Sequence, residues 1–173
     1  EIKRYEKYFS NHIASNTGIY GKVGVLMLDC SESHRLGYIA DEILNYDTFI
    51  IDHHQTSNAD DNFSIINSNA PAAAYLVQLI YEHFIGQPDK HTAEILLLGM
   101  CTDTGFFKFL DEKSTTVFLA VSRLVERGAN PKHIFTQISS GKPFSTRKLL
   151  SVMLERAQLK FNNRLIYTYE TLE

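Results

Sequence analysis

Apolar residues along the chain follow two spacings, one typical of strands and one typical of helices. Residues 23–28 and 48–51 form short apolar runs, partly β-branched and bounded by turn residues, which predicts strands buried on both faces. Between them, apolar residues recur at helical spacing over residues 35–45, which predicts a helix. This succession indicates a parallel βαβ unit, in which ligands bind at the carboxyl ends of the strands.

The rest of the chain is predicted to be mostly helical. Helical spacing, with Pro, Ser and Gly at the expected ends, predicts helices over residues 2–14, 69–86, 90–100, 114–127, 131–139 and 143–160. Alternation over residues 164–169 favours a final strand. We therefore predict an α/β fold with a parallel sheet and flanking helices, followed by a long connecting helix.

Composition narrows the class of protein. With 173 residues, 44% of them hydrophobic and 21% charged, the chain lies close to the average for globular domains. Its apolar runs are much shorter than the ~20 residues of a membrane-spanning helix, so we expect no membrane span. Cys30 and Cys101 form no Cys-x-x-Cys motif, which favours reduced thiols in a cytoplasmic protein.

Charge is distributed unevenly, although the formal net charge is only -3. Residues 29–61 hold eight acidic side chains and one basic one, whereas residues 141–164 hold six basic side chains and one acidic one. An acidic region favours a hard-cation site, and a basic region could steer an anionic substrate. Solvated surface charge is the alternative explanation for most of these residues taken singly.

Carboxylates and imidazoles directly follow apolar elements in three places. The segments are Leu28-Asp29-Cys30, Ile51-Asp52-His53-His54 and Gly99-Met-Cys-Thr-Asp103-Thr-Gly105. An Asp after a buried run needs a counter-charge or a proton, and a divalent metal supplies that charge. Carboxylate and imidazole ligands suit Mn²⁺, Mg²⁺ or Zn²⁺, and the predominance of oxygen favours the harder ions. Taken alone, Asp29 could instead cap a helix, and residues 102–105 could form an Asx turn.

Together and in this order, the three segments resemble the motifs of the DHH phosphoesterase superfamily. Within it, the chain is most similar to the oligoribonuclease and phosphoadenosine-phosphate phosphatase branch. The similarity continues through residues 106–130, 148–156 and 163–168, and so covers nearly the whole chain. It implies a DHH domain over residues 1–140, a connecting helix over 141–162, and the start of a C-terminal substrate-binding domain over 163–173.

The resemblance also implies a role for each site residue. Asp29, His53 and Asp103 would bind metal, with Asp29 bridging two divalent ions, Mn²⁺ in preference to Mg²⁺. His54 would contact the scissile phosphate, and Asp52 would orient the imidazoles. Two such ions activate a water for in-line displacement at phosphorus. The expected function is therefore metal-dependent hydrolysis of small nucleotides or short single-stranded oligonucleotides.

The chain also departs from the family. The family's first motif, a His and two Asp after the first strand, is not found in this sequence, nor is most of the C-terminal domain. We expect a fragment of a longer protein, with a degenerate relative as the alternative. A pyrophosphatase or polyphosphatase, and a catalytically silent nucleotide- or protein-binding module, are alternative functions. A homodimer is compatible with the resemblance, but the residues determine neither the substrate nor the oligomeric state.

Overall fold

The computed structural model describes residues 24–43, 45–55, 63–139 and 143–171. These residues divide into two compact units, which meet in the chain between Ile134 and Phe135, and each unit is described by itself. The helix predicted over residues 2–14 lies outside the described residues. Within the described part, every helix is too short or too polar to cross a lipid bilayer.

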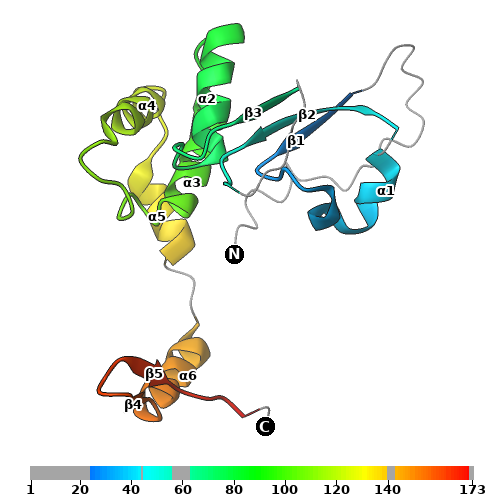
Figure 1. The fold of residues 1–173 in the computed structure, drawn as a ribbon. Helices are drawn as coiled ribbons and strands as arrows, with labels where there is room; N and C mark the ends of the chain where they lie inside the picture. The colour runs from blue at the N-terminus through cyan, green and yellow to red at the C-terminus, as the bar shows by residue number, and fades with distance from the viewer. Residues whose placement is uncertain (1–23, 44, 56–62, 140–142, 172–173) are drawn as a thin grey trace. The chain divides into compact units, whose positions relative to one another are not determined.

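The first unit contains the predicted parallel sheet (Figure 1). Its strands are β1 (Gly24–Leu28), β2 (Asp47–Asp52) and β3 (Ser64–Ile66), arranged in the order β1-β2-β3. The register pairs Leu28 with Ile51, and Ile51 with Ile65. Because the strands are parallel, their carboxyl ends lie along one edge of the sheet, where α/β folds place their ligands.

The crossover from β1 to β2 is less regular than the predicted helix. It consists of a 3₁₀ helix, η2 (Ser33–Ile39), and a short α1 (Ala40–Ile43). Gly37 interrupts the helical path with φ 61° and ψ -132°, a conformation that residues with a side chain rarely adopt.

The predicted burial of both strands on two faces is wrong for β1. Leu26 and Leu28 are 58% and 47% exposed, whereas Ile51 of β2 is 4% exposed. The reason is that β1 is an edge strand of the described sheet, and helix α2 (Ala73–Phe84) packs over β2 instead. Ile51 meets Leu76 of α2 in a small apolar cluster.

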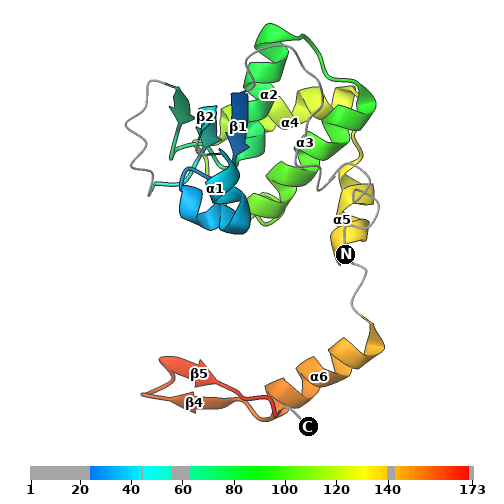
Figure 2. The ribbon, with the colours of Figure 1, turned by 90° about the vertical axis from the view of Figure 1, so that its right-hand side faces the viewer.

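Helices α2, α3 (Lys90–Asp103) and α4 (Thr115–Glu126) pack against one another, as both ribbon views show (Figure 2), and α5 (Pro131–Ser139) follows them. Asp89 caps the start of helix α3, because its side chain accepts a 2.7 Å hydrogen bond from the Thr92 N–H. Helices α2 and α3 approach closely at Gly99, because a Cβ added there would lie 2.7 Å from the Ala74 Cβ. Gly99 thus permits the contact between the two helices.

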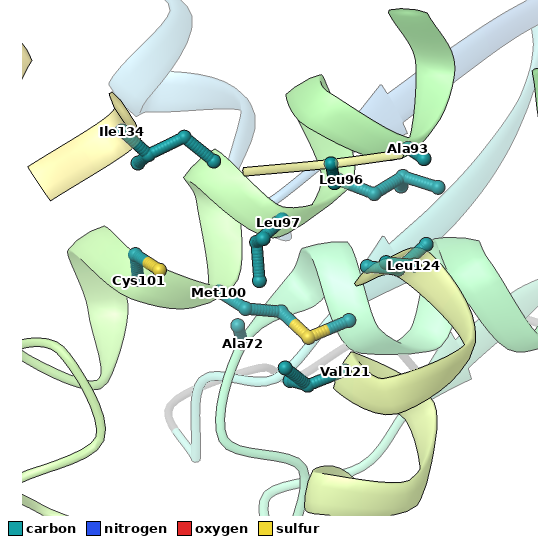
Figure 3. Packing of buried hydrophobic residues seen from close by; sticks show 10 residues of the cluster. Ala72, Ala93, Leu96, Leu97, Met100, Cys101, Val121, Leu124 and Ile134 are labelled. Carbon is teal, nitrogen blue, oxygen red and sulfur yellow. The ribbon is translucent and has the colours of Figure 1, made fainter. Parts of the chain in front are cut away.

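The main core of the first unit lies among these helices (Figure 3). Its buried members are Ala72, Ala93, Leu96, Leu97, Met100, Cys101, Val121, Leu124, Ala129 and Ile134. Half of them belong to α3, which agrees with the prediction of a helix buried on most sides. Helix α3 extends three residues beyond the predicted end at residue 100, so Asp103 is the last residue of a helix anchored in the core.

The second unit contains α6 (Phe144–Glu155) and a hairpin of β4 (Gln158–Lys160) and β5 (Leu165–Tyr167). The connecting helix expected over residues 141–162 is therefore wrong beyond Glu155, although the final strand is present. The physical reason is the turn between the strands. Phe161, Asn162 and Asn163 have φ of 52°, 53° and 66°, and Asn tolerates this left-handed conformation better than most residues.

Candidate metal centre

All five predicted site residues lie together where the chain leaves β1, β2 and α3. Asp29 follows β1, Asp52 ends β2 with His53 and His54 directly after it, and Asp103 ends α3. The Nε2 of His53 lies 3.2 Å from the Asp29 Oδ1 and 3.9 Å from the Asp103 Oδ2. The Nδ1 of His54 lies 3.7 Å from the same Asp29 oxygen. Segments far apart in the sequence therefore converge on one position at the edge of the sheet.

Asp52 is the buried anchor of this cluster. Its side chain is 0% exposed, and its Oδ1 accepts hydrogen bonds from the His53 N–H at 2.7 Å and the His54 N–H at 3.1 Å. The ring Nδ1 of His54 donates to the same oxygen at 2.7 Å. Burial opposes the charged form, but the hydrogen bonds from His54, Ser31 and His53 outweigh it and hold the pKa of Asp52 below its usual value.

Polar partners also orient each imidazole ring. The Nδ1 of His53 lies 3.3 Å from the Ala70 carbonyl oxygen. The Nε2 of His53 faces Asp29 and Asp103, so it is the ring nitrogen that an ion bound between these carboxylates would use. In the second ring, the Asp52 carboxylate holds a proton on the Nδ1 of His54.

Asp29 reaches the cluster through an unusual backbone conformation. Its φ of 60° lies in the left-handed region, which costs a non-glycine residue about 1–2 kcal/mol. The Asp29 N–H donates to the Ile51 carbonyl at 2.9 Å, which extends the β1–β2 ladder by one residue. The ladder thus holds a strained residue in place, as is common where a side chain must be aimed at a functional site.

Negative charge is concentrated at this end of the sheet. Burial and the negative charge of Asp29 raise the pKa of Asp103, and the opposing effects of His53 and His54 are smaller. The side chains of Asp29, His54 and Asp103 are 51%, 37% and 33% exposed, so the cluster is open to a ligand from solvent. A group of this kind favours a bound cation.

The donor set fits a divalent metal ion. Asp29, His53 and His54 each offer one ligand atom, and these atoms lie within 4.8 Å of one another. Two ligands bound at right angles, each about 2.1 Å from an ion, lie about 3 Å apart. The 3.2 Å separation between Asp29 and His53 is close to that value, and Asp103 is near enough to the same nitrogen to contribute another oxygen. Mixed oxygen and nitrogen donors suit Mn²⁺, Mg²⁺ or Zn²⁺.

One group at the centre was not expected from the sequence. The Ala70 carbonyl oxygen contacts the His53 ring, but every residue has a backbone carbonyl, so the amino-acid sequence could not indicate this contact.

The two cysteines, in contrast, stay outside the metal-binding group of the described residues. Both are free thiols: Cys30 donates to the Glu32 carbonyl at 3.3 Å, and Cys101 is buried in the core.

Comparison with known proteins identifies the fold. None of the protein-family models compared with the chain matches it. The structure is similar to that of an exopolyphosphatase-related protein from Bacteroides fragilis, with a TM-score of 0.72 and 20% sequence identity. The match covers 78% of this chain but 41% of that one, so this chain spans about two fifths of that protein's length. The similarity confirms the predicted α/β fold class, a parallel sheet with flanking helices.

Proposed function

We propose that this chain is part of a metal-dependent phosphoesterase of the DHH superfamily. The observation that carries the proposal is the convergence of Asp29, His53 and His54 on one position, with Asp103 beside it. That position lies at the carboxyl edge of a parallel sheet, where α/β proteins bind ligands. The similarity in fold to an exopolyphosphatase-related protein supports the same class of chemistry.

Each residue has a distinct part in the proposed reaction. Bound divalent ions would supply a Lewis acid and lower the pKa of a water molecule. Asp29 and Asp103 contribute anionic oxygens, and His53 contributes the Nε2 lone pair. His54, which Asp52 holds through Nδ1, would donate a hydrogen bond from Nε2 to a phosphoryl oxygen of the substrate when the ring carries a proton on both nitrogens. Asp52 itself holds the two histidines through its hydrogen bonds.

The proposed substrate is a small nucleotide or a short single-stranded oligonucleotide, as the resemblance to the oligoribonuclease branch implies. Polyphosphate is the second candidate, because the structural neighbour is described as exopolyphosphatase-related. Both substrates present phosphoryl oxygens to the same side chains. They differ in whether the leaving group is a nucleoside oxygen or another phosphate.

A calorimetric titration of Mn²⁺ into the whole chain tests the metal centre, with Mg²⁺ and Zn²⁺ in parallel. We expect Asp29→Asn and His53→Gln each to weaken binding by at least about 10-fold. Asp47→Asn is the matched control, because this exposed acid lies at the other end of the sheet, at the start of β2. Mn²⁺ at about 100 times its Kd should also add about 2.7 kcal/mol to the unfolding free energy.

If none of the three ions binds, the metal-dependent function is wrong and a catalytically silent binding module becomes the better account. A hydrolysis assay under Mn²⁺ then separates the substrates, using a short RNA, phosphoadenosine phosphate and polyphosphate. Hydrolysis of the RNA or the nucleotide supports the first candidate, and hydrolysis of polyphosphate alone supports the second. Asp103→Asn should abolish either activity while leaving the protein folded.

A further inference from the structure

The turn that follows α3 carries three phenylalanines, and they are buried unequally. Phe106 and Phe107 pack against the main core, whereas Phe109 is 68% exposed. Single exposed apolar side chains are ordinary on a protein surface, so exposure alone gives Phe109 no role. Its place in the fold is more informative, because the turn begins directly after Asp103 of the metal centre.

Hydrogen bonds within the turn fix its backbone. Gly105, Phe106 and Phe107 are left-handed in succession, with φ of 56°, 56° and 69°, which is unfavourable for residues with a side chain. Two N–H groups donate to Thr104, that of Phe107 to the hydroxyl oxygen at 3.0 Å and that of Phe109 to the carbonyl oxygen at 3.2 Å. The exposed Phe109 is therefore presented by a defined turn.

The Phe109 ring lies against the backbone of Gly105. A Cβ added to Gly105 would lie 2.7 Å from the Phe109 Cε2 and 2.9 Å from the Lys108 Cε. Gly105 comes two residues after Asp103, so the Cα atoms of these two residues are at most about 7.6 Å apart. An exposed aromatic ring thus lies close to one of the proposed metal ligands.

A positive charge accompanies the ring. The Nζ of Lys108 lies 4.6 Å from the centroid of the Phe109 ring, within the range of a cation–π contact. An exposed ring beside basic groups is the combination with which proteins bind single-stranded nucleic acids, whose bases stack on the ring. A ligand that consists only of phosphates makes no use of the ring.

We propose that Phe109 is the platform on which the base of a nucleotide substrate stacks. The inference rests on the proposed function, because the phosphate of the same ligand must lie at the metal centre. A nucleotide carries its base one ribose away from its phosphate, which brings the base within reach of a ring this close to Asp103. The platform favours a nucleotide over polyphosphate as the substrate, since polyphosphate has no base to stack.

Three ligands separate the base from the phosphate. They are adenosine, methylphosphonate, and the phosphonate analogue of AMP, in which a methylene group replaces the bridging oxygen and prevents hydrolysis. Calorimetry measures each dissociation constant for the whole chain in the presence of Mn²⁺. Stacking of one base on an aromatic side chain raises affinity by about 5-fold or more. We therefore expect Phe109→Ala to weaken binding of the AMP analogue by at least about 5-fold and to leave methylphosphonate binding unchanged.

Three further variants show whether the aromatic face itself matters. Phe109→Leu keeps an apolar side chain against Gly105 and should lose as much affinity as Phe109→Ala, whereas Phe109→Tyr keeps the ring and should bind as the wild type does. Phe84→Ala is the matched control, because Phe84 is 77% exposed at the end of the 12-residue helix α2, about 16 Å from its start. Both positions are exposed, so we expect the variants to fold, and circular dichroism checks this.

Unchanged binding of the AMP analogue in Phe109→Ala and Phe109→Leu would overturn the platform. An equal loss of methylphosphonate binding would also overturn it, because the turn rather than the ring would then be responsible. If the wild type binds methylphosphonate as tightly as the AMP analogue, the platform is wrong and the proposed function stands. If adenosine binds in a manner that depends on Phe109 but methylphosphonate does not bind, the platform stands and the proposed phosphate site is wrong. A chain that binds none of the three ligands refutes both.

Discussion

The two carboxylates that face His53 are supported in opposite ways. Asp29 follows β1, an edge strand whose Leu26 is 58% exposed, and the hydrogen bond from its N–H to Ile51 extends the sheet ladder. Asp103 ends α3, in which Leu97 is 0% exposed and fully surrounded by the helical core. Backbone hydrogen bonds thus hold one side of the centre, and close packing holds the other.

This difference has a consequence for mutations. Changes beneath α3 should cost the protein stability, because they remove packed apolar contacts. Changes along the exposed side of β1 should cost little stability, because those side chains are already in contact with water. The two sides of the centre can therefore be perturbed independently, and matched residues on each side allow the comparison to be tested.

The largest expected difference is between the two thiols. Cys30 follows Asp29 and is partly exposed, whereas Cys101 is fully buried in α3, and burial raises the pKa of its thiol to about 11. Because the thiolate is the reactive form, iodoacetamide should modify native Cys101 at least about 10³-fold more slowly than Cys30. Mass spectrometry before and after denaturation measures this, and equal labelling rates in the native protein would contradict the packing described for α3.

A matched pair of leucine substitutions tests the same difference in stability. Leu97→Ala should lower the unfolding free energy by about 2–5 kcal/mol, because it leaves a cavity in the core. Leu26→Ala should lower it by about 0.5 kcal/mol or less, since its side chain is mostly exposed. Urea denaturation of both variants measures the effects. Equal losses would mean that β1 is covered as closely as α3.

The contact between α2 and α3 allows a sharper test. Gly99→Ala places a Cβ 2.7 Å from the Ala74 Cβ, and the helices must shift at a cost of about 1–3 kcal/mol. Ala74→Gly removes the opposing methyl group. The double variant should therefore be more stable than the sum of the two single losses predicts, and a double-mutant cycle measures that coupling. If the two single losses add exactly, the methyl group introduced at position 99 does not collide with the Ala74 methyl group, and the close approach of the two helices is contradicted.

The smallest expected effect concerns the ion pair that joins α4 to α2. The Nε of Arg123 donates to both oxygens of Glu82, at 3.1 and 2.9 Å. Burial opposes the charged form of Glu82, but hydrogen bonds from Arg123 and Gln78 and the charge of Arg123 hold its pKa below the usual 4.5. At neutral pH, Glu82→Gln should cost about 1 kcal/mol or less, because Arg123 is 41% exposed.

The same pair predicts a dependence on pH. Since the pKa of Glu82 is lower in the folded protein, its stabilisation is complete above the unfolded value of about 4.5. It is lost as the pH falls through the folded value. The difference in unfolding free energy between the wild type and Glu82→Gln should therefore shrink as the pH falls below about 4.5. A difference that stays constant from neutral to acid pH would contradict this role of the ion pair.

Local patterns in the sequence determined β1 and β2 and placed Asp29 and Asp52 at their ends, whereas β3 was not predicted. The apolar run before Asp29 and the run before Asp52 each end where the structure ends a strand, because a buried strand and a following polar turn are both local features. The helical spacing of residues 90–100 likewise predicted α3. The sequence order alone therefore indicated that carboxylates and imidazoles follow buried elements.

Features that depend on contacts between distant segments of the chain were decided only by the tertiary structure. The hairpin of β4 and β5 replaced the end of a predicted helix, because residues 158–160 gain hydrogen bonds from residues 165–167 that local spacing does not reveal. The exposure of Leu26 depended on which strand α2 covers. The contact of the His53 ring with the Ala70 carbonyl also depended on the fold, because a backbone carbonyl is present in every residue and gives no sequence signal. Strand pairing, helix coverage and the contacts of the ring are properties of contacts between segments, so they follow from the fold.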